Sequence, residues 1–371
     1  MKLLSYRTIA LILILAGTTL CTQAQAPGPI AFDGTHIWVG DQITPTSGRL
    51  VELDPATGAQ LFTYPLPGPP SDIIHPYGAS DLWITIIGPQ PEVLEWLLSS
   101  NTQGRVFPTL TDPGAVVVQS PADLLDCFAC PQHSYLWVAE YGGAIEKFDL
   151  STNTRVAEYT GFPRANRLAF DGINIWVAYQ TGSGLGQLTK MTTSGSVLFT
   201  LTKNQLSDVT YDGRNLWLMS LVGCEQSGQC DIEEIDLSGQ HLNWVDVGGA
   251  TYGGPLSGMS DGTNLWVINY PAVGHGWITK VVESTGQVLG TFPVDNQPQR
   301  AAFDGTNVWV TNYADGTLVK LLASNGANEG TFSAEIYSVP LGARGAMEAA
   351  RARSGAEILT LPQNAFKVTG H

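Results

Sequence analysis

The sequence predicts an all-β fold, a seven-bladed β-propeller of four-stranded antiparallel blades. Three observations predict it. A tryptophan-centred motif recurs along the chain, Asp-Gly and Asn-Gly turns separate short apolar runs, and the composition is rich in glycine (41) and proline (22) but low in charged residues, 14%. Many short strands joined by tight turns produce such a composition. A chain of 371 residues is also long enough to bury a large core.

The recurring motif is an Asp-Gly turn followed by a strand with a central tryptophan. Clean copies read AFDGTHIWVGD at 31–41, AFDGINIWVAY at 169–179, TYDGRNLWLMS at 210–220, MSDGTNLWVIN at 259–269 and AFDGTNVWVTN at 302–312. Two degenerate copies, HPYGASDLWITI at 75–86 and CPQHSYLWVAE at 130–140, bring the number to seven. A period of about 40–45 residues is typical of one propeller blade, so seven copies predict seven blades.

Each copy divides into four strands, which we name a to d. In the last copy they cover 300–303, 307–312, 317–322 and 330–336, and turns rich in Gly separate them. Such turns are strong hairpin signals because Gly adopts positive φ without strain. Strand b is apolar on both faces, with Val308 and Val310 on one and Trp309 on the other. Blades that stack face to face bury both sides of a strand, which favours a propeller over a β-sandwich.

The two ends of the chain depart from the repeat. Residues 1–24 form a predicted signal peptide, because Lys2 and Arg7 flank the start of an apolar run that is too short to span a bilayer. The propeller is expected over 25–337, and 338–371 is expected to be a C-terminal tail with a candidate short helix and a candidate closing strand. Whether this tail braces the ring, and how the ring closes, stays open. The predicted location is secreted or periplasmic.

The charge of the chain limits the classes of partner that we expect it to bind. The formal net charge is −15, and such an acidic chain disfavours nucleic acid and anionic membrane surfaces. No segment after the signal is apolar enough to cross a membrane. A protein partner, or a small neutral or cationic ligand, fits this charge, and we expect a monomer.

The binding face is predicted from the loops. In a propeller the d-to-a and b-to-c connections share one face. Here the expected b-to-c connections, which include 41–48, 180–186, 223–230 and 271–276, vary in length, whereas the opposite turns are short and uniform. Variable loops on a rigid scaffold are where binding usually occurs. Strand b leaves toward this face three residues after each tryptophan, at the following positions: Asp41, Ile86, Glu140, Tyr179, Ser220, Asn269 and Asn312. Asp41, Glu140, Tyr179, Asn269 and Asn312 are the candidate ligand-binding residues, and the competing interpretation is a set of solvated strand ends.

Catalytic chemistry has little support in the motifs. His275 is the histidine of a b-to-c loop, and no partner carboxylate lies in its own loop, so we predict no catalytic residue and keep His275 as the alternative. A nucleophile elbow, a phosphate loop and a zinc helix motif are absent from the sequence. The repeated Asp of the Asp-Gly turns is expected to cap its own turn rather than to bind metal.

Four cysteines follow the signal segment: Cys127, Cys130, Cys224 and Cys230. Each pair is close in sequence, and the two pairs fall on opposite faces of non-adjacent blades. Two local disulfides are therefore favoured, in keeping with export. The alternatives are a redox motif, which would need a helix N-terminus at the first cysteine, and a zinc site built from all four.

Several stretches resemble known propeller families. WVTNYADGTLVKL at 309–321 resembles the "YVTN" repeat, whereas LVELDPATGAQLFTYPLP at 50–67 and LWVAEYGGAIEKFDLSTNTRVAEYTG at 136–161 resemble repeats of the streptogramin B lyase (virginiamycin B lyase) propellers. The resemblance covers roughly 30–336 and implies seven blades. It also suggests an enzyme: the lyases use a histidine and carboxylate cluster with magnesium, and gluconolactonase-like propellers bind a divalent metal through Glu, Asn and Asp.

Three functional hypotheses follow. The leading one is a non-enzymatic, exported binding or interaction protein without a cofactor, whose ligand face is formed by the b-to-c and d-to-a loops. The alternative is a lyase or lactonase that depends on a divalent cation such as Mg or Ca, with Asp41, Glu140, Asn269 and Asn312 as metal ligands and His275 as base. The third is a structural module of an envelope layer.

Overall fold

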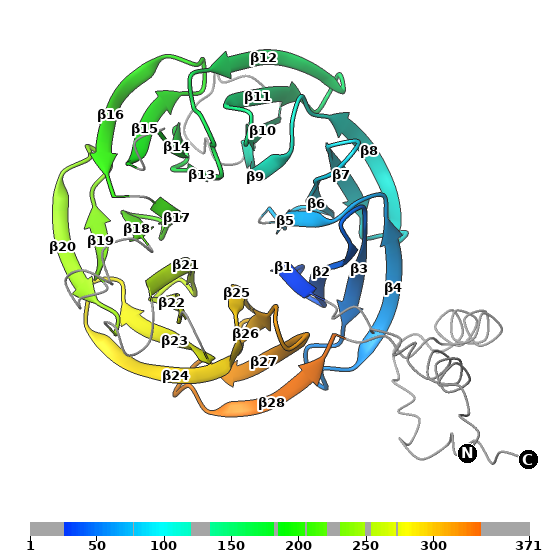
Figure 1. The fold of residues 1–371 in the computed structure, drawn as a ribbon, viewed down its shortest axis with the longest axis vertical. Coiled ribbons are helices and arrows are strands. Elements are labelled where there is room, and N and C mark those ends of the chain that lie inside the picture. The colour runs from blue at the N-terminus through cyan, green and yellow to red at the C-terminus, as the bar shows by residue number, and fades with distance from the viewer. Residues whose placement is uncertain are drawn as a thin grey trace, which may run out of the picture. The chain divides into compact units, whose positions relative to one another are not determined.

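The computed structural model describes residues 26–76, 78–119, 134–181, 185–204, 206–220, 231–248, 254–271 and 274–334. All elements in these ranges are strands, and seven four-stranded antiparallel sheets contain them. Figure 1 shows the sheets as blades around a common centre, with the first strand of each innermost and the fourth outermost. The predicted seven-bladed all-β propeller is confirmed.

Each blade takes four consecutive strands of the chain, which correspond to strands a to d. Blade 1 contains β1 (Ala26–Phe32), β2 (Ile37–Thr44), β3 (Ser47–Leu53) and β4 (Gln60–Leu66), and blade 2 contains β5 (Pro70–Ile74), β6 (Asp81–Ile86), β7 (Glu92–Leu97) and β8 (Thr102–Pro108). Blade 3 contains β9 (Pro113–Gln119), β10 (Tyr135–Glu140), β11 (Ala144–Asp149) and β12 (Thr154–Thr160), and blade 4 contains β13 (Arg167–Phe170), β14 (Asn174–Gln180), β15 (Gly186–Thr192) and β16 (Val197–Lys203). Blade 5 contains β17 (Leu206–Tyr211), β18 (Leu216–Ser220), β19 (Asp231–Ile235) and β20 (His241–Asp246), and blade 6 contains β21 (Gly254–Ser260), β22 (Asn264–Tyr270), β23 (His275–Val282) and β24 (Val288–Asn296). Blade 7 contains β25 (Pro298–Phe303), β26 (Asn307–Asn312), β27 (Thr317–Leu322) and β28 (Asn328–Ser333).

The repeated tryptophans are buried between blades. All seven are at most 1% exposed: Trp38, Trp83, Trp137, Trp176, Trp217, Trp266 and Trp309. In blade 7, Trp309 packs in one apolar cluster with Ile37 and Leu53 of blade 1. Val308 and Val310, on the other face of β26, pack with Trp266 of blade 6. The prediction that strand b is buried on both faces is confirmed, because each blade is covered by a neighbour on either side.

The Asp of each clean Asp-Gly turn has two functions in the fold. Asp304 Oδ1 accepts hydrogen bonds from the backbone N–H groups of Thr306 and Asn307, which caps the turn as predicted. Its Oδ2 accepts the indole N–H of Trp309 at 2.8 Å. The same indole bond links Trp38 to Asp33, Trp176 to Asp171, Trp217 to Asp212 and Trp266 to Asp261. The motif therefore spaces the Asp so that one carboxylate closes the turn and satisfies the buried indole.

A lysine opposite the tryptophan connects one blade to the next. Lys320 pairs with Trp309 across β26 and β27, and its Nζ lies 5.3 Å from the indole centroid. That Nζ donates to the Pro55 carbonyl in the c-to-d turn of blade 1, at 2.9 Å. Three further blades repeat the arrangement: Lys147 reaches Thr193, Lys190 reaches Leu237 and Lys280 reaches Ala323. In blade 2, Arg105 lies over Trp83 and donates to the Leu150 carbonyl of blade 3.

The ring closes between blades 7 and 1 without a shared blade. Besides the Lys320 bond, Thr311 Oγ1 donates to the Gly28 carbonyl at 2.7 Å, and Arg49 donates to the Ala334 carbonyl at 2.9 Å. Gly58 has a φ of +69°, and a Cβ at this position would lie 2.1 Å from the Phe332 ring of blade 7. Apolar packing, backbone contacts and one obligatory glycine therefore close the ring.

One predicted loop is wrong, and others lie outside the described residues. The segment 41–48 was expected as a b-to-c loop of blade 1, but β2 continues to Thr44 and β3 begins at Ser47, so two residues make the turn. The extended pairing arises because Asp41 and Gln42 continue the ladder opposite Arg49 and Gly48. The signal segment, the tail and the four cysteines, Cys127, Cys130, Cys224 and Cys230, lie outside the described residues. Disulfide pairing, export and the domain boundaries therefore remain predictions.

Replacing Asp304 tests the double function of the turn Asp. Asp304→Ala removes two turn caps and leaves a buried indole N–H without an acceptor, so we expect a loss of about 2–3 kcal/mol of unfolding free energy. Asp236→Ala is the matched control, because Asp236 caps its c-to-d turn through Ser238 and Gln240 in an exposed place. It should cost about 1 kcal/mol or less. Urea unfolding measures both, and equal losses would contradict the role of the indole bond.

Candidate functional site

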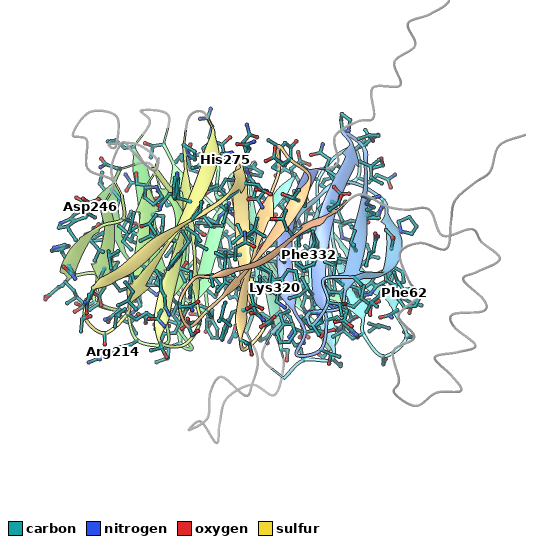
Figure 2. The ribbon with its side chains drawn as sticks, turned by 90° about the horizontal axis from the view of Figure 1, so that it is seen from below. Phe62, Arg214, Asp246, His275, Lys320 and Phe332 are labelled. Carbon is teal, nitrogen blue, oxygen red and sulfur yellow. The ribbon has the colours of Figure 1, made fainter. Side chains whose placement is uncertain are left out.

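The two faces of the ring carry different connections. Figure 2 labels His275, at the start of β23 on the b-to-c side, and Arg214, in an a-to-b turn, and they lie toward opposite faces. The b-to-c and d-to-a connections share the face that His275 marks. The two kinds of connection therefore share one face as expected, and strand b of each blade ends at this face.

The candidate strand-exit residues are buried. Asp41, Glu140, Asn269 and Asn312 all have 0% exposure, whereas Tyr179 is half-buried. The interpretation of these four positions as solvated strand ends is therefore wrong. A fully buried polar side chain needs partners, and these partners show what the position does.

Two of the four tether a d-to-a connection. Glu140 accepts from the backbone N–H groups of Leu110 and Thr111, at 3.0 and 3.2 Å, in the connection that leads into blade 3. Asn269 donates to the Val247 carbonyl at 3.1 Å, in the connection that leads into blade 6. Polar side chains at the end of strand b thus hold the incoming chain against the blade.

The other two belong to blades 1 and 7, which meet at the seam of the ring. Asp41 forms an ion pair with Arg49 at 2.5 Å, and Arg49 in turn donates to the Ala334 carbonyl. Asn312 donates to the carbonyls of Val310 and Thr317 within its own blade, at 3.2 and 3.4 Å. The contacts of Glu140, Asn269 and Asn312 reach none of the other predicted metal ligands. In the described ranges, no group of three or more His, Cys, Asp or Glu side chains could hold a metal ion.

A hollow of about 310 Å³ lies on the predicted face at blade 3. Its walls come from the β8–β9 and β12–β13 connections, which are d-to-a, from the β10–β11 connection, which is b-to-c, and from the adjoining strand ends. The lining residues are Leu110, Thr111, Glu140, Gly142, Gly143, Ala144, Glu158, Thr160, Gly161, Phe162 and Pro163. Of the predicted residues, Glu140 contributes to this hollow directly. Tyr179 supports it from outside, because its ring packs edge-on against Phe162 at 5.4 Å between centroids.

Glu140 forms a buried carboxyl pair with Glu146. Burial, together with a hydrogen bond and charge repulsion from the neighbouring Glu146, raises the pKa of Glu140 to about 8. Glu146 is also fully buried and forms an ion pair with Arg155. The pair therefore holds one proton at neutral pH, because two adjacent carboxylates cannot both ionise cheaply in a buried place. Arg155, which lies outside the hollow lining, neutralises the ionised member.

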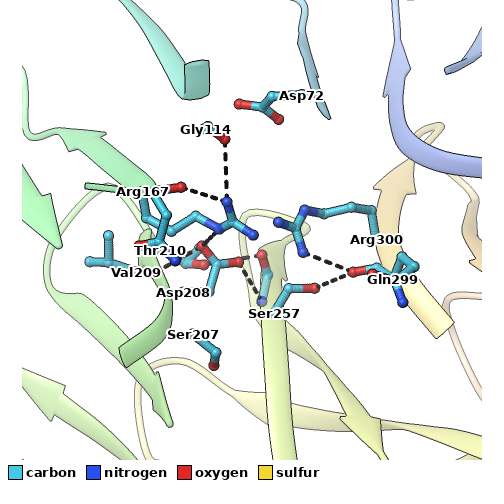
Figure 3. A network of polar contacts seen from close by, with 12 residues as sticks. Asp72, Gly114, Arg167, Ser207, Asp208, Val209, Thr210, Ser257, Gln299 and Arg300 are labelled. Atoms are coloured by element: carbon cyan, nitrogen blue, oxygen red, sulfur yellow. Dashed lines mark hydrogen bonds and ion pairs between the residues drawn. The ribbon is translucent and has the colours of Figure 1, made fainter. Parts of the chain in front are cut away.

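No sequence motif pointed to the network of polar side chains at the centre of the ring. Asp72, Arg167, Asp208 and Arg300 project from β5, β13, β17 and β25, the innermost strands of four blades (Figure 3). Arg167 Nε lies 3.3 Å from Asp208 Oδ1, and burial raises the pKa of Asp208 to about 6 and that of Asp72 above its ordinary value. A signal was present: a polar residue precedes the apolar run of strand a in SDII, NRLAF, SDVTY and QRAAF. Each run is too short to show by itself that these residues share one channel.

His275 does not join these groups. Its side chain is exposed at the first residue of β23, where it pairs with Asn296 in the ladder.

The described chain contains no helix with the length and apolar character needed to cross a membrane.

Comparisons with known proteins show the architecture. No protein-family model and no curated protein matches the chain. Among solved structures, hydrazine synthase of Kuenenia stuttgartiensis is similar with a TM-score of 0.68 and 15% identity, over 84% of this chain and 99% of that chain. The computationally designed protein Ika8 is similar with a TM-score of 0.56 and 14% identity, over 84% of this chain and 87% of that one. At these identities the likeness shows the fold alone.

Glu140 should make the stability of the protein depend on pH. Its pKa of about 8 in the folded chain exceeds its ordinary value of 4.5, so across that window the folded state binds more protons than the unfolded state. The free energy of unfolding should therefore fall as the pH rises from about 5 to about 8.5, and Glu140→Gln should reduce this fall. Urea unfolding at both pH values measures it. Glu158→Gln, at the same hollow, is the control and should keep the wild-type slope, and an unchanged slope in Glu140→Gln would contradict the assignment.

Proposed function

We propose that this protein is an exported binding protein that takes its ligand in the hollow at blade 3. The observation that carries this proposal is the construction of the hollow from two d-to-a connections, one b-to-c connection and the strand ends that adjoin them. The strands beneath them are rigid, since each blade is buried against two neighbours. A recess formed by connections on such a scaffold is the usual place for a binding site.

The lining indicates the class of ligand. Leu110 and Phe162 supply apolar surface, Glu158 supplies a carboxylate, and Glu140 supplies a buried carboxyl that shares a proton with Glu146. No Lys or Arg lines the hollow. Leu110 is 52% exposed, and Tyr141 in the adjoining b-to-c connection is 47% exposed. Exposed apolar residues beside a recess that carries the Glu158 carboxylate and no Lys or Arg favour a partner with an apolar body and a neutral or cationic group. The net charge of −15 favours the same class.

Filling the hollow tests the proposal. Thr160 lies exposed at the end of β12, so Thr160→Trp should fill the hollow without disturbing the core. Thr202→Trp places the same ring near the end of β16 in the next blade and is the matched control. The probe is phenethylammonium, and its neutral analogue 3-phenylpropanol is compared, by ligand-observed NMR.

We expect saturable binding of phenethylammonium to the wild type and to Thr202→Trp, and a loss of about tenfold or more in Thr160→Trp. Binding of the alcohol alone would place the ligand in the neutral class. If neither probe binds the wild type, or if Thr160→Trp binds as the wild type does, the hollow is not the binding site.

The metal-dependent lyase or lactonase is the second candidate. One observation favours it: Asn269 Oδ1 and Asn312 Oδ1, from adjacent blades, are buried acceptors without a donor in the described chain. Amide oxygens are suitable ligands for Ca²⁺. The other two proposed ligands, Asp41 and Glu140, already hold Arg49 and the Leu110–Thr111 backbone, which argues against this candidate.

Metal analysis separates the two candidates. After purification without chelator, elemental analysis should find no stoichiometric divalent ion, and Asn312→Ala should leave that content unchanged. A stoichiometric ion that chelator removes and that Asn312→Ala loses, together with cleavage of a lactone or cyclic depsipeptide, would establish the enzyme instead.

A further inference from the structure

The innermost strands carry bulges where they enter the ring. The pairing of strands a and b shifts in register near the start of β1, β5, β9, β17, β21 and β25. A bulge inserts unpaired residues and redirects their side chains. In β25 the shift lies between Pro298 and Ala301, so Gln299 and Arg300 are the bulged residues. The start of strand a follows the d-to-a connection, so these bulges lie at the mouth of the channel on the predicted binding face.

Hydroxyl groups join these bulges from blade to blade. Ser71 donates to the Pro113 carbonyl at 2.8 Å, and Ser207 donates to the Pro255 carbonyl at 2.9 Å. Ser257 donates to the Gln299 carbonyl at 3.0 Å, next to Arg300. The backbone around the channel mouth is therefore held in place, and the side chains that project from it start from fixed positions.

Two arginines face each other across this mouth. Figure 3 shows the guanidinium groups of Arg167 and Arg300 pointing toward one another. Arg167 Nη1 donates to the carbonyls of Asn166 and Gly114, and its Nε faces Asp208. Arg300 Nη1 donates to the Gln299 carbonyl at 2.9 Å. In the part of the chain that the structure describes, Nη2 of both arginines and Nε of Arg300 have no hydrogen-bond partner.

The carboxylates nearby do not balance Arg300. Asp208 is paired with Arg167 and accepts from the Gly258 N–H at 3.3 Å. Asp72 accepts from the N–H groups of Val116 and Ile73. No carboxylate in the described chain forms an ion pair with Arg300, which is half-buried. Asp208 offsets the charge of Arg167, whereas the half-buried guanidinium of Arg300 has no charged partner in the described chain. An anion between the two guanidinium groups would supply that partner.

We propose that the channel mouth binds a small oxyanion between Arg300 and Arg167, through a carboxylate or a phosphate-like group. The free N–H groups of a guanidinium form a planar fork that matches two oxygens of such an anion. Two forks from opposite sides fit an anion with at least two accessible oxygens. This site lies at the centre of the ring, apart from the hollow at blade 3. The two binding proposals are therefore independent of each other.

Isothermal titration with potassium phosphate, and separately with sodium acetate, tests the proposal at constant ionic strength against chloride. We expect saturable binding of at least one of the two anions to the wild type, and a loss of about tenfold or more in Arg300→Gln, the cost of one or two charge-assisted hydrogen bonds. Arg214→Gln removes an exposed arginine from the opposite face and should bind as the wild type does. Phosphate binding without acetate binding would identify a phosphate-like group, and the reverse would identify a carboxylate.

Arg300→Lys is a second variant, made in case Arg300→Gln fails to fold. It keeps the positive charge but loses the planar fork of the guanidinium group. It should bind several-fold more weakly than the wild type. If neither anion binds the wild type more strongly than chloride does, or if both Arg300 variants bind unchanged, the proposal is wrong. Thr160→Trp should retain oxyanion binding, so failure of the hollow and failure of the channel site can be distinguished.

Discussion

The buried tryptophan of each blade is the contact on which the ring depends. It fills the space between neighbouring blades, and burial of such a ring stabilises the fold by about 4–6 kcal/mol before chain entropy is counted. The indole N–H must then be satisfied without water, and the Asp of the preceding turn does this in five blades, as Asp304 does for Trp309. The cation above the ring, Lys320 in blade 7, reaches the next blade. One motif therefore closes the a-to-b turn, supplies the largest side chain of the core and places a cation that contacts the next blade.

The same packing explains why the strand-exit positions are structural. Because each blade is covered on both faces, the end of strand b is buried, and a polar residue there must bind the nearest backbone. Glu140 and Asn269 accordingly hold the incoming d-to-a connections. Two places remain for a ligand: the recess between connections at blade 3 and the polar groups at the centre of the ring. Both are formed by segments from several blades, and the recess lies on the face predicted from the variable loops.

The repeat made most of the fold predictable, because its signals are local. The strands over 307–312 and 317–322 have the predicted bounds in blade 7. The site was less predictable. Position in the repeat identified Glu140, which lines the hollow, but not its burial, nor the neighbouring carboxyl of Glu146, six residues on across a hairpin. Leu110 and Phe162 have no motif at all, since they belong to connections whose path depends on the blades that they join.

The sequence by itself determined that the chain forms a ring of seven blades, because turn residues, strand periodicity and the tryptophan spacing act within about 45 residues. Only the tertiary structure decided what the ring encloses. Arg167 and Arg300 are far apart in the chain, and each follows a bulge or connection whose direction is set by packing against neighbouring blades. They face one another because closure of the ring brings the first strands of all blades around a single axis (Figure 3). No local sequence pattern predicts that these side chains converge.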